Sequence, residues 1–229
     1  MSVNIFLDAG GVILDETSFE EKSAEIITKI IKGFNNDYTI ENYWNDADEA
    51  VYRYVPKVYD YILYKHLGGK GDFTKSKAEY KETLKNAHLG FQLTHGIREF
   101  LAGLSGIYNI GILGQYGKDF RDYLESENLL LYFTYTEIQD NYPITKPDPR
   151  YFEAILKKDN CNPIESIMVG DRIDKDIIPA KMTGLKTIRI KTGLHRNQEP
   201  RIPEEIPDMT VKKITDISIE SLRELMPAC

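Results

Sequence analysis

Cysteine is scarce in this sequence. The 229 residues contain two cysteines, Cys161 and Cys229, which lie far apart in the chain. Two isolated cysteines exclude a disulfide framework of the kind that stabilises small secreted proteins, and they exclude the paired spacing of a cysteine metal site. We therefore expect the protein to work in a reducing compartment, and the cytoplasm fits best.

Long apolar runs and an excess of positive charge are also missing. No stretch reaches the roughly 20 apolar residues that a membrane-spanning helix needs. The first residues, MSVNIFLDAGG, lack the basic segment of a signal peptide, and Asp8 interrupts their apolar run. The formal net charge of −7 does not favour contact with nucleic acid or with an anionic membrane. We expect neither as a partner, so any phosphate-binding site must be local.

The chain does contain enough apolar and charged residues for a globular protein with a core. Hydrophobic residues make up 41% of it and charged residues 28%, proportions typical of soluble domains. Short apolar runs, which favour buried parallel strands, alternate with helical patterns from residue 96 onward. This alternation predicts an α/β fold, with a parallel sheet and helices on both of its faces. The expected strands are Val3–Leu7, Tyr108–Leu113, Phe133–Ile138, Ser166–Val169, Lys186–Ile190 and Thr210–Lys213.

Residues 15–95 interrupt the alternation, because no strand-like run occurs there. Ser18 and Glu21 have the spacing of a capping box, and apolar residues then repeat on one helical face. Apolar repeats on either side of Pro56 predict two helices or a kinked one, and another helix is expected near 73–88. We interpret 15–95 as a small all-helical cap domain inserted into a core formed by 1–14 and 96–229.

The candidate functional residues follow the expected strands. In an open parallel sheet, ligands bind beyond the carboxyl ends of the strands. The polar and glycine residues at those ends are Asp8, Gly114 with Gln115, Lys146 and Asp171. Each has a structural explanation when it is taken singly, since aspartate favours turns and helix N-termini and a loop lysine is usually solvated. Their order and spacing together form a pattern.

Three stretches of the sequence resemble the haloacid dehalogenase-like hydrolase superfamily. They are FLDAGGV, which contains Asp8, TKPDPRYF, which contains Lys146, and IMVGDRIDKDIIPAKMTGLKTI, which contains Asp171 and Asp176. The likeness covers essentially the whole chain. It implies a Rossmann-like core with a cap inserted after the first strand. It also implies an enzyme that hydrolyses a small phosphorylated metabolite with Mg²⁺ as its cofactor, as a monomer or a homodimer.

The resemblance further implies a role for each matching residue. Asp8 would be the nucleophile, forming an aspartyl-phosphate that water then hydrolyses. The Asp8 carboxylate, the backbone carbonyl of Gly10, Asp171 and Asp176 would hold the metal, the last directly or through water. Lys146 would neutralise the phosphate and Asp8 as both a catalytic and a substrate-binding residue. The remaining candidate substrate contacts are Gly11, Gly114 and Gln115.

Two positions depart from the family's pattern. Family phosphatases usually carry a second aspartate two residues after the nucleophile, which protonates the leaving group, and this chain has Gly10 there. Missing proton transfer costs roughly 10²–10⁴-fold when the leaving group is basic. Gly114 replaces the hydroxyl residue expected after the second strand, which removes a hydrogen bond to phosphate. We expect low activity, a good leaving group or another proton donor, and we expect Asp174 to lie at the surface.

These departures leave other functions open. One is a protein of the same fold that binds phosphate or a partner with little catalysis. Another is hydrolysis of a carbon–halogen or carbon–phosphorus bond, because dehalogenases and phosphonate hydrolases of this family also lack the second aspartate. A phosphonate hydrolase would need an imine-forming lysine in the cap, for which Lys57, Lys65 and Lys70 are available.

Overall fold

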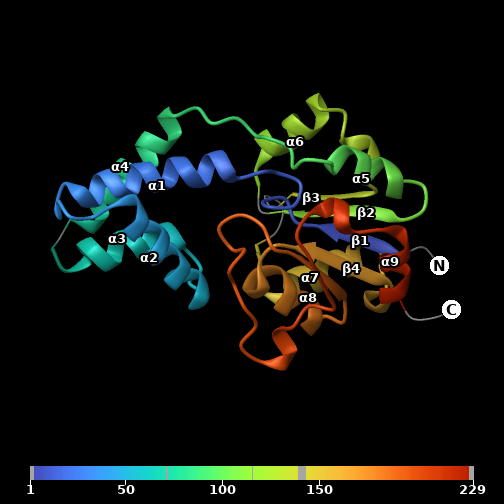
Figure 1. Cartoon of the computed structure of the whole chain (residues 1–229). Helices are drawn as coiled ribbons and strands as arrows, with labels where there is room; N and C mark the ends of the chain where they lie inside the picture. Colours follow the sequence, from blue (N-terminus) through green and yellow to red (C-terminus); the bar gives the residue numbers. More distant parts are fainter. Residues whose placement is uncertain (1–2, 71, 115, 139–142, 227–229) are drawn as a thin grey trace. The chain divides into compact units, whose positions relative to one another are not determined.

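The structure, a computed structural model, describes residues 3–70, 72–114, 116–138 and 143–226 (Figure 1). These residues divide into two units. The sheet unit comprises the described residues of Met1–Asp15, Phe91–Thr192 and Pro200–Cys229. The helical unit comprises those of Glu16–Gly90 and Gly193–Glu199.

Six parallel strands form the sheet unit, in the order β3-β2-β1-β4-β5-β6. The chain runs outward from β1 through β2 to β3, and then returns to the other side of β1 with β4. Strand order therefore reverses between β1 and β4, and ligands bind at such reversals in open α/β sheets. The strands are β1 (Asn4–Leu7), β2 (Asn109–Gly114), β3 (Tyr135–Ile138), β4 (Ser166–Gly170), β5 (Lys186–Ile190) and β6 (Met209–Val211).

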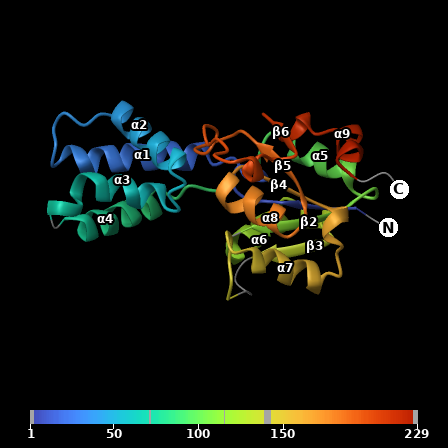
Figure 2. The ribbon, with the colours of Figure 1, turned by 90° about the horizontal axis from the view of Figure 1, so that it is seen from below.

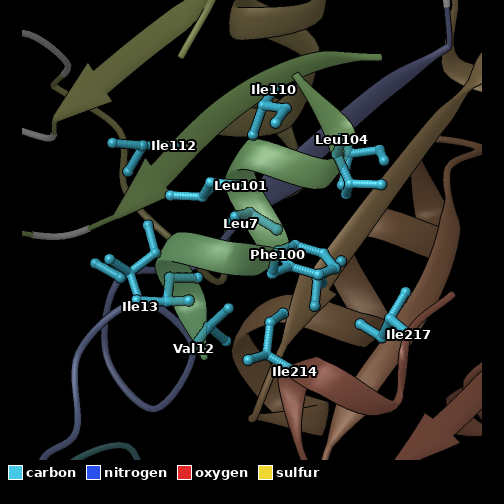
Figure 3. Packing of buried hydrophobic residues seen from close by; sticks show 14 of the residues in the cluster. Leu7, Val12, Ile13, Phe100, Leu101, Leu104, Ile110, Ile112, Ile214 and Ile217 are labelled. Carbon is cyan, nitrogen blue, oxygen red and sulfur yellow. The ribbon is translucent and has the colours of Figure 1, made fainter. Parts of the chain in front are cut away.

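Helices cover both faces of this sheet because alternate strand residues point to opposite sides. Ile5 and Leu7 of β1 pack in a core with helices α5 (Ile97–Leu104), α6 (Lys118–Ser126) and α9 (Ile219–Leu225). Phe6 packs on the other face, in a core with α7 (Pro149–Lys158) and α8 (Ile178–Met182), and Figure 2 shows these helices around the strands. In the first core, Phe100, Leu101 and Leu104 of α5 share one cluster with Leu7 of β1 and with Ile110 and Ile112 of β2 (Figure 3). The predicted fold class is confirmed.

Short helical turns complete the sheet unit. The π-helical turn η5 leads directly into α8 and follows β4 by two residues. The 3₁₀ turns lie in the connections between the longer elements. The π-helical turn η5 spans Ile173–Ile177. The 3₁₀ turns are η2 (Leu130–Tyr132), η4 (Pro163–Glu165), η6 (Pro203–Glu205) and η7 (Ile214–Asp216).

The helical unit contains α1 (Thr17–Lys32), α2 (Ile40–Tyr52), α3 (Val58–Leu67), the 3₁₀ turn η1 (Gly68–Lys70) and α4 (Phe73–Asn86). Its core includes the fully buried Ile27, Ile31, Tyr43 and Ile62. Two separate helices flank Pro56, which is one of the two alternatives that the sequence left open. The predicted capping box of Ser18 and Glu21 is wrong: α1 begins at Thr17 with Glu16 as its N-cap residue, and no side chain caps it. Ser18 lies inside the first turn, where its backbone is already helical and a cap is impossible.

The boundaries of the units differ from those expected for a core and a cap. Residues 91–95 belong to the sheet unit, where Thr94 N–H donates to the Ile13 carbonyl at 2.9 Å. Residues 193–199 belong to the helical unit, where Leu194 N–H donates to Glu20 Oε1 at 2.7 Å. Such long-range hydrogen bonds produce no periodicity in the sequence. The apolar pattern therefore could not show to which unit residues 91–95 and 193–199 belong. The roles of the units as catalytic core and cap stay predictions.

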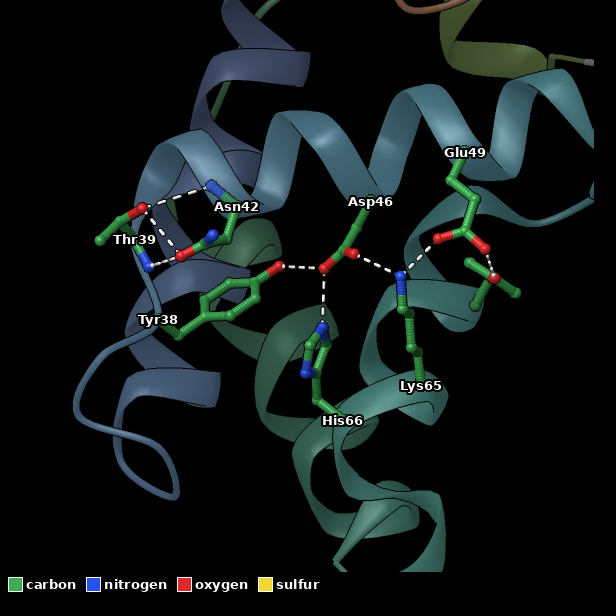
Figure 4. A network of polar contacts seen from close by, with 8 residues as sticks. Tyr38, Thr39, Asn42, Asp46, Glu49, Lys65 and His66 are labelled. Carbon is green, nitrogen blue, oxygen red and sulfur yellow. Dashed lines mark hydrogen bonds and ion pairs between the residues drawn. The ribbon is translucent and has the colours of Figure 1, made fainter.

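A buried carboxylate joins α2 to α3 in the helical unit (Figure 4). Asp46 of α2 is 7% exposed. Its Oδ1 accepts a hydrogen bond from Lys65 Nζ at 2.6 Å, and its Oδ2 lies 2.8 Å from Tyr38 Oη and 2.7 Å from His66 Nε2. Lys65 also pairs with Glu49. Burial by itself raises the pKa of Asp46, but the hydrogen bonds from Lys65, His66 and Tyr38 outweigh burial and hold it below its usual range.

This lowered pKa predicts a pH-dependent effect of Asp46→Asn. A carboxylate whose pKa is lower in the folded state stabilises the fold above its unfolded pKa of about 3.9. That stabilisation is lost as the pH falls through the folded pKa. At pH 7 we expect Asp46→Asn to lower the free energy of unfolding by about 2 kcal/mol, and we expect the difference from wild type to shrink below pH 4.

The measurement is urea unfolding followed by tryptophan fluorescence. Trp44 is the only tryptophan in the sequence and packs against the core of the helical unit, so its fluorescence reports on this unit. Asp37→Asn is the control, because Asp37 is exposed. A stability difference that stays constant from pH 7 to pH 3 would contradict the assignment.

Candidate active site

Asp8 lies where the central strand ends. Its N–H donates to the carbonyl of Val169 on β4 at 2.9 Å, which extends the pairing of β1 with β4 by one residue. The side chain is therefore held at the carboxyl edge of the sheet, where strand order reverses. Its exposed fraction is 14%, against 2% for Lys146 and none for Asp176. Among these three side chains, Asp8 is the most accessible to a ligand.

Lys146 bridges two carboxylates from separate parts of the chain. It lies three residues before α7, and its Nζ donates to Asp8 Oδ1 at 2.5 Å and to Asp176 Oδ1 at 2.6 Å. Burial alone lowers the pKa of the Lys146 ammonium, but the charges of Asp176 and Asp8 outweigh burial and hold it above its usual range. Lys146 is thus a permanent cation in the interior. Removing either partner would leave buried charge uncompensated, which is costly.

Two glycines make room for the remaining carboxylates. Gly11 has φ +70°, and a Cβ there would lie 3.0 Å from Asp171 Cγ. At Gly170 a Cβ would lie 2.4 Å from Asp176 Cβ, a distance that real Cβ atoms do not adopt. Asp171 and Asp176 can therefore approach the strand ends only because both positions lack a side chain. Gly170 directly precedes Asp171, and it is a residue of the site that the motif pattern did not indicate.

Asp8, Asp171 and Asp176 together fit a divalent cation. One carboxylate oxygen from each lies within 4.8 Å of the others. The pKa of Asp176 is raised to about 6, because it is fully buried and faces the charge of Asp8, and Lys146 opposes this rise only in part. The three carboxylates outnumber the one ammonium group, that of Lys146, which pairs with two of them. Hard oxygen ligands with excess negative charge suit Mg²⁺.

The other candidate residues are only partly placed by the structure. Gln115 lies outside the described residues, and the roles predicted for Gly10, Gly11 and Gly114 stay predictions. Gly114 itself has a packing explanation, because a Cβ there would lie 2.7 Å from Ala9 Cβ. The side chain of Ala9, in the segment that follows β1, occupies the space that a hydroxyl side chain at residue 114 would need.

Asp174 is not the surface residue that the sequence suggests. Its side chain is 13% exposed and accepts two hydrogen bonds from Arg172, from Nε at 3.1 Å and from Nη2 at 2.6 Å. The arginine two residues earlier satisfies the carboxylate, so burial does not leave it unpaired. The backbone N–H of Arg172 also donates to Asp176 Oδ2 at 3.1 Å. Arg172 is a residue of the site that sequence reasoning missed.

Comparison with known proteins identifies the family. A model of the haloacid dehalogenase-like hydrolases matches residues 6–190. The chain belongs to the haloacid dehalogenase-like hydrolases. The predicted enzyme class, a hydrolase of this family, is confirmed, and the fold agrees with that membership.

Curated proteins that are similar to this chain include phosphatases. The glyceraldehyde 3-phosphate phosphatase of Pyrococcus abyssi is 29% identical over 198 residues, which cover 82% of this chain and 81% of that protein. That of Methanopyrus kandleri is 32% identical over 94 residues, which cover 41% of this chain and 40% of the relative. The second match therefore spans less than half of the relative's length.

A solved structure shares the fold of this haloacid dehalogenase-like hydrolase. It is the HAD-hydrolase YfnB from Bacillus subtilis bound to magnesium, with a TM-score of 0.65, 16% sequence identity, and coverage of 94% of this chain and 96% of that chain. At this identity the likeness shows the fold alone. Among the described residues of the present chain, no helix is both long and apolar enough to cross a membrane.

The packing of Gly114 against Ala9 predicts the effect of restoring a hydroxyl residue. Gly114→Ser should lower the free energy of unfolding by about 1–3 kcal/mol, because the new Cβ overpacks a buried position. Ala9→Gly in the same chain should recover part of that loss by removing the opposing methyl group. Urea unfolding followed by circular dichroism measures both effects.

Gly103→Ser is the matched control for this substitution. Gly103 is exposed on α5, and nothing lies within 4 Å of a Cβ built there. Its replacement should change stability by less than about 0.5 kcal/mol. Equal stability of the Gly114→Ser protein and wild type would show that Ala9 does not limit this position.

Proposed function

We propose that this hydrolase is a Mg²⁺-dependent phosphatase that removes the phosphoryl group of a small phosphorylated metabolite through an aspartyl-phosphate on Asp8. One observation carries the proposal: a partly exposed carboxylate at the sheet edge is held by a buried lysine and lies beside two further carboxylates. A site that served only to bind phosphate would not need three carboxylates around its lysine.

Asp8 has the position of a nucleophile. An oxygen of its carboxylate forms a bond to phosphorus while the bond from phosphorus to the ester oxygen breaks, which leaves an alkoxide that takes up a proton. Water then attacks the aspartyl-phosphate, releasing inorganic phosphate and restoring the carboxylate. Lys146 donates to Asp8 Oδ1 at 2.5 Å and so fixes the orientation of the carboxylate through both steps.

Charge neutralisation is the other requirement of phosphoryl transfer. Asp8, Asp171 and Asp176 would hold Mg²⁺, with the backbone carbonyl of Gly10 as a further ligand. When bound, the ion offsets the charge of the phosphoryl oxygens and keeps the anionic nucleophile and the anionic substrate together. Lys146 supplies the fixed positive charge of the chain itself at this place.

Glycine at position 10 affects how the leaving group is protonated. It provides no side chain that could protonate an alkoxide, so the proton must come from water, from the substrate or from elsewhere in the protein. The reaction should therefore favour substrates whose leaving group is weakly basic. The curated relatives suggest the substrate class, and we propose a three-carbon phosphate ester such as glyceraldehyde 3-phosphate. Its leaving group is a basic alkoxide, so we expect slow turnover of this ester in comparison with aryl phosphates.

Phosphonate hydrolysis has less support from the helical unit. Lys65 donates to Asp46 and also pairs with Glu49, and these hydrogen bonds raise the pKa of its ammonium. A protonated lysine cannot form an imine. Lys57 is exposed, and the side chain of Lys70 lies outside the described part of the chain.

Asp8→Asn should abolish phosphate release, because an amide cannot replace the carboxylate nucleophile. The assay measures inorganic phosphate from p-nitrophenyl phosphate, glyceraldehyde 3-phosphate and glycerol 3-phosphate, with Mg²⁺ or with EDTA. We expect turnover by wild type with Mg²⁺, and a loss of more than about 10³-fold in the variant. EDTA should have a comparable effect on wild type.

The control is Asp122→Asn, which removes one carboxylate from an exposed ion pair with Lys118 on α6 and should leave turnover unchanged. Wild-type turnover that does not exceed that of Asp8→Asn on any of these esters would contradict the proposal. It would favour the binding function or the hydrolysis of a bond other than a phosphate ester.

Gly10→Asp should supply the missing proton donor. The described positive φ angles include Gly11 but not Gly10, so the backbone conformation at residue 10 does not by itself require glycine. We expect hydrolysis of glycerol 3-phosphate to rise by about 10²-fold, and that of p-nitrophenyl phosphate to change little, because nitrophenolate leaves without protonation.

The matched control for this variant is Gly10→Asn, which has the same shape but no carboxyl proton. It should leave both rates close to those of wild type. Equal acceleration of the alkyl and aryl esters by Gly10→Asp would rule out leaving-group protonation as the cause.

A further inference from the structure

A fully buried arginine lies beside the candidate active site. Arg189, on β5, is 2% exposed and is among the largest fully buried side chains. A guanidinium group stays protonated inside proteins. Burying it is unfavourable unless its N–H groups are hydrogen-bonded. The contacts of Arg189 therefore indicate what this position stabilises.

The register of the sheet places Arg189 next to the metal-binding loop. Arg189 pairs with Gly170, the last residue of β4, and Asp171 follows directly. Its neighbours Ile188 and Ile190 belong to the core on the face of α5 and α9, so the alternation of strand residues directs Arg189 to the opposite face. That is the face of Gly170 and of the other core.

Arg189 contacts one peptide group that links the two buried carboxylates. Its Nε donates to the Asp171 carbonyl at 3.3 Å. The N–H of the same peptide group belongs to Arg172 and donates to Asp176 Oδ2 at 3.1 Å. Because a peptide group is planar, a donor at one edge and an acceptor at the other fix its rotation. The relative orientation of Asp171 and Asp176 then depends on both hydrogen bonds.

We propose that Arg189 is a positioning residue for the Mg²⁺ site, acting through the peptide group between Asp171 and Arg172. The inference rests on the metal site of the proposed function. Loss of a group that orients a metal ligand through a hydrogen bond typically lowers metal affinity by about 10–100-fold. Without Arg189 this peptide group can rotate, and the Asp171 and Asp176 carboxylates lose their common geometry.

The test is Mg²⁺ binding by Arg189→Met, which keeps an aliphatic stem but removes the charge and the donors. Calorimetric titration of Mg²⁺ into the protein without substrate gives the dissociation constant. We expect a rise of about 10-fold relative to wild type, and a matching rise in the Mg²⁺ concentration that gives half-maximal phosphate release. Arg189→Lys, which keeps the charge and donors on a flexible stem, should restore part of the affinity.

A purely structural role of Arg189 gives a different result. Ile155→Ala on α7, in the core on the same face of the sheet, should lower the melting temperature and leave Mg²⁺ affinity unchanged. A folded Arg189→Met protein that behaves in the same way would overturn the inference. If Arg189→Met does not fold, the shorter and neutral Arg189→Gln is judged by the same criterion.

Mg²⁺ binding also separates this inference from the proposed function. Wild type that binds Mg²⁺ but hydrolyses no phosphate ester would contradict the proposed function, and weaker binding by the variant would still support the role of Arg189. Wild type that does not bind Mg²⁺ would overturn the inference. Asp171→Asn provides the reference for a site that has lost a ligand.

Discussion

The pairing of the Lys146 ammonium with two carboxylates is the interaction on which the site depends. Lys146 Nζ contacts Asp8 and Asp176, which enter from the end of β1 and from the turn after β4. A buried ammonium is tolerated only with such partners. The ion pairs therefore tie the loop before α7 to both sides of the point at which strand order reverses.

The same arrangement explains why glycine occurs where the strands end. Gly11 and Gly170 leave the space that the Asp171 and Asp176 side chains occupy, and Gly114 leaves space for Ala9. These glycines keep bulk away from a crowded edge of the sheet. The carboxylates can then lie close together. Lys146 offsets their mutual repulsion only in part, and this remaining repulsion favours the binding of a divalent cation.

Much of this could be predicted because the relevant signals are local. Each of the six strands was expected within two residues of its observed ends, since buried parallel strands are short apolar runs. The motifs of the site can be recognised from short stretches of sequence and from their order along the chain. They contain Asp8, Lys146, Asp171 and Asp176. The errors concern features that neither apolar periodicity nor motif spacing encodes: the first residue of α1, the pairing of Asp174 with Arg172, and the membership of residues 193–199.

The sequence by itself determined the fold class, the family and the residues at the strand ends, because apolar periodicity and motif spacing are written along the chain. Only the tertiary structure decided that Lys146 bridges two carboxylates, that Ala9 excludes a side chain at residue 114, and that Arg189 contacts the carbonyl of Asp171. These contacts join residues 18 to 138 positions apart. No periodic pattern encodes them, since they arise when parallel strands from separate parts of the sequence are placed side by side.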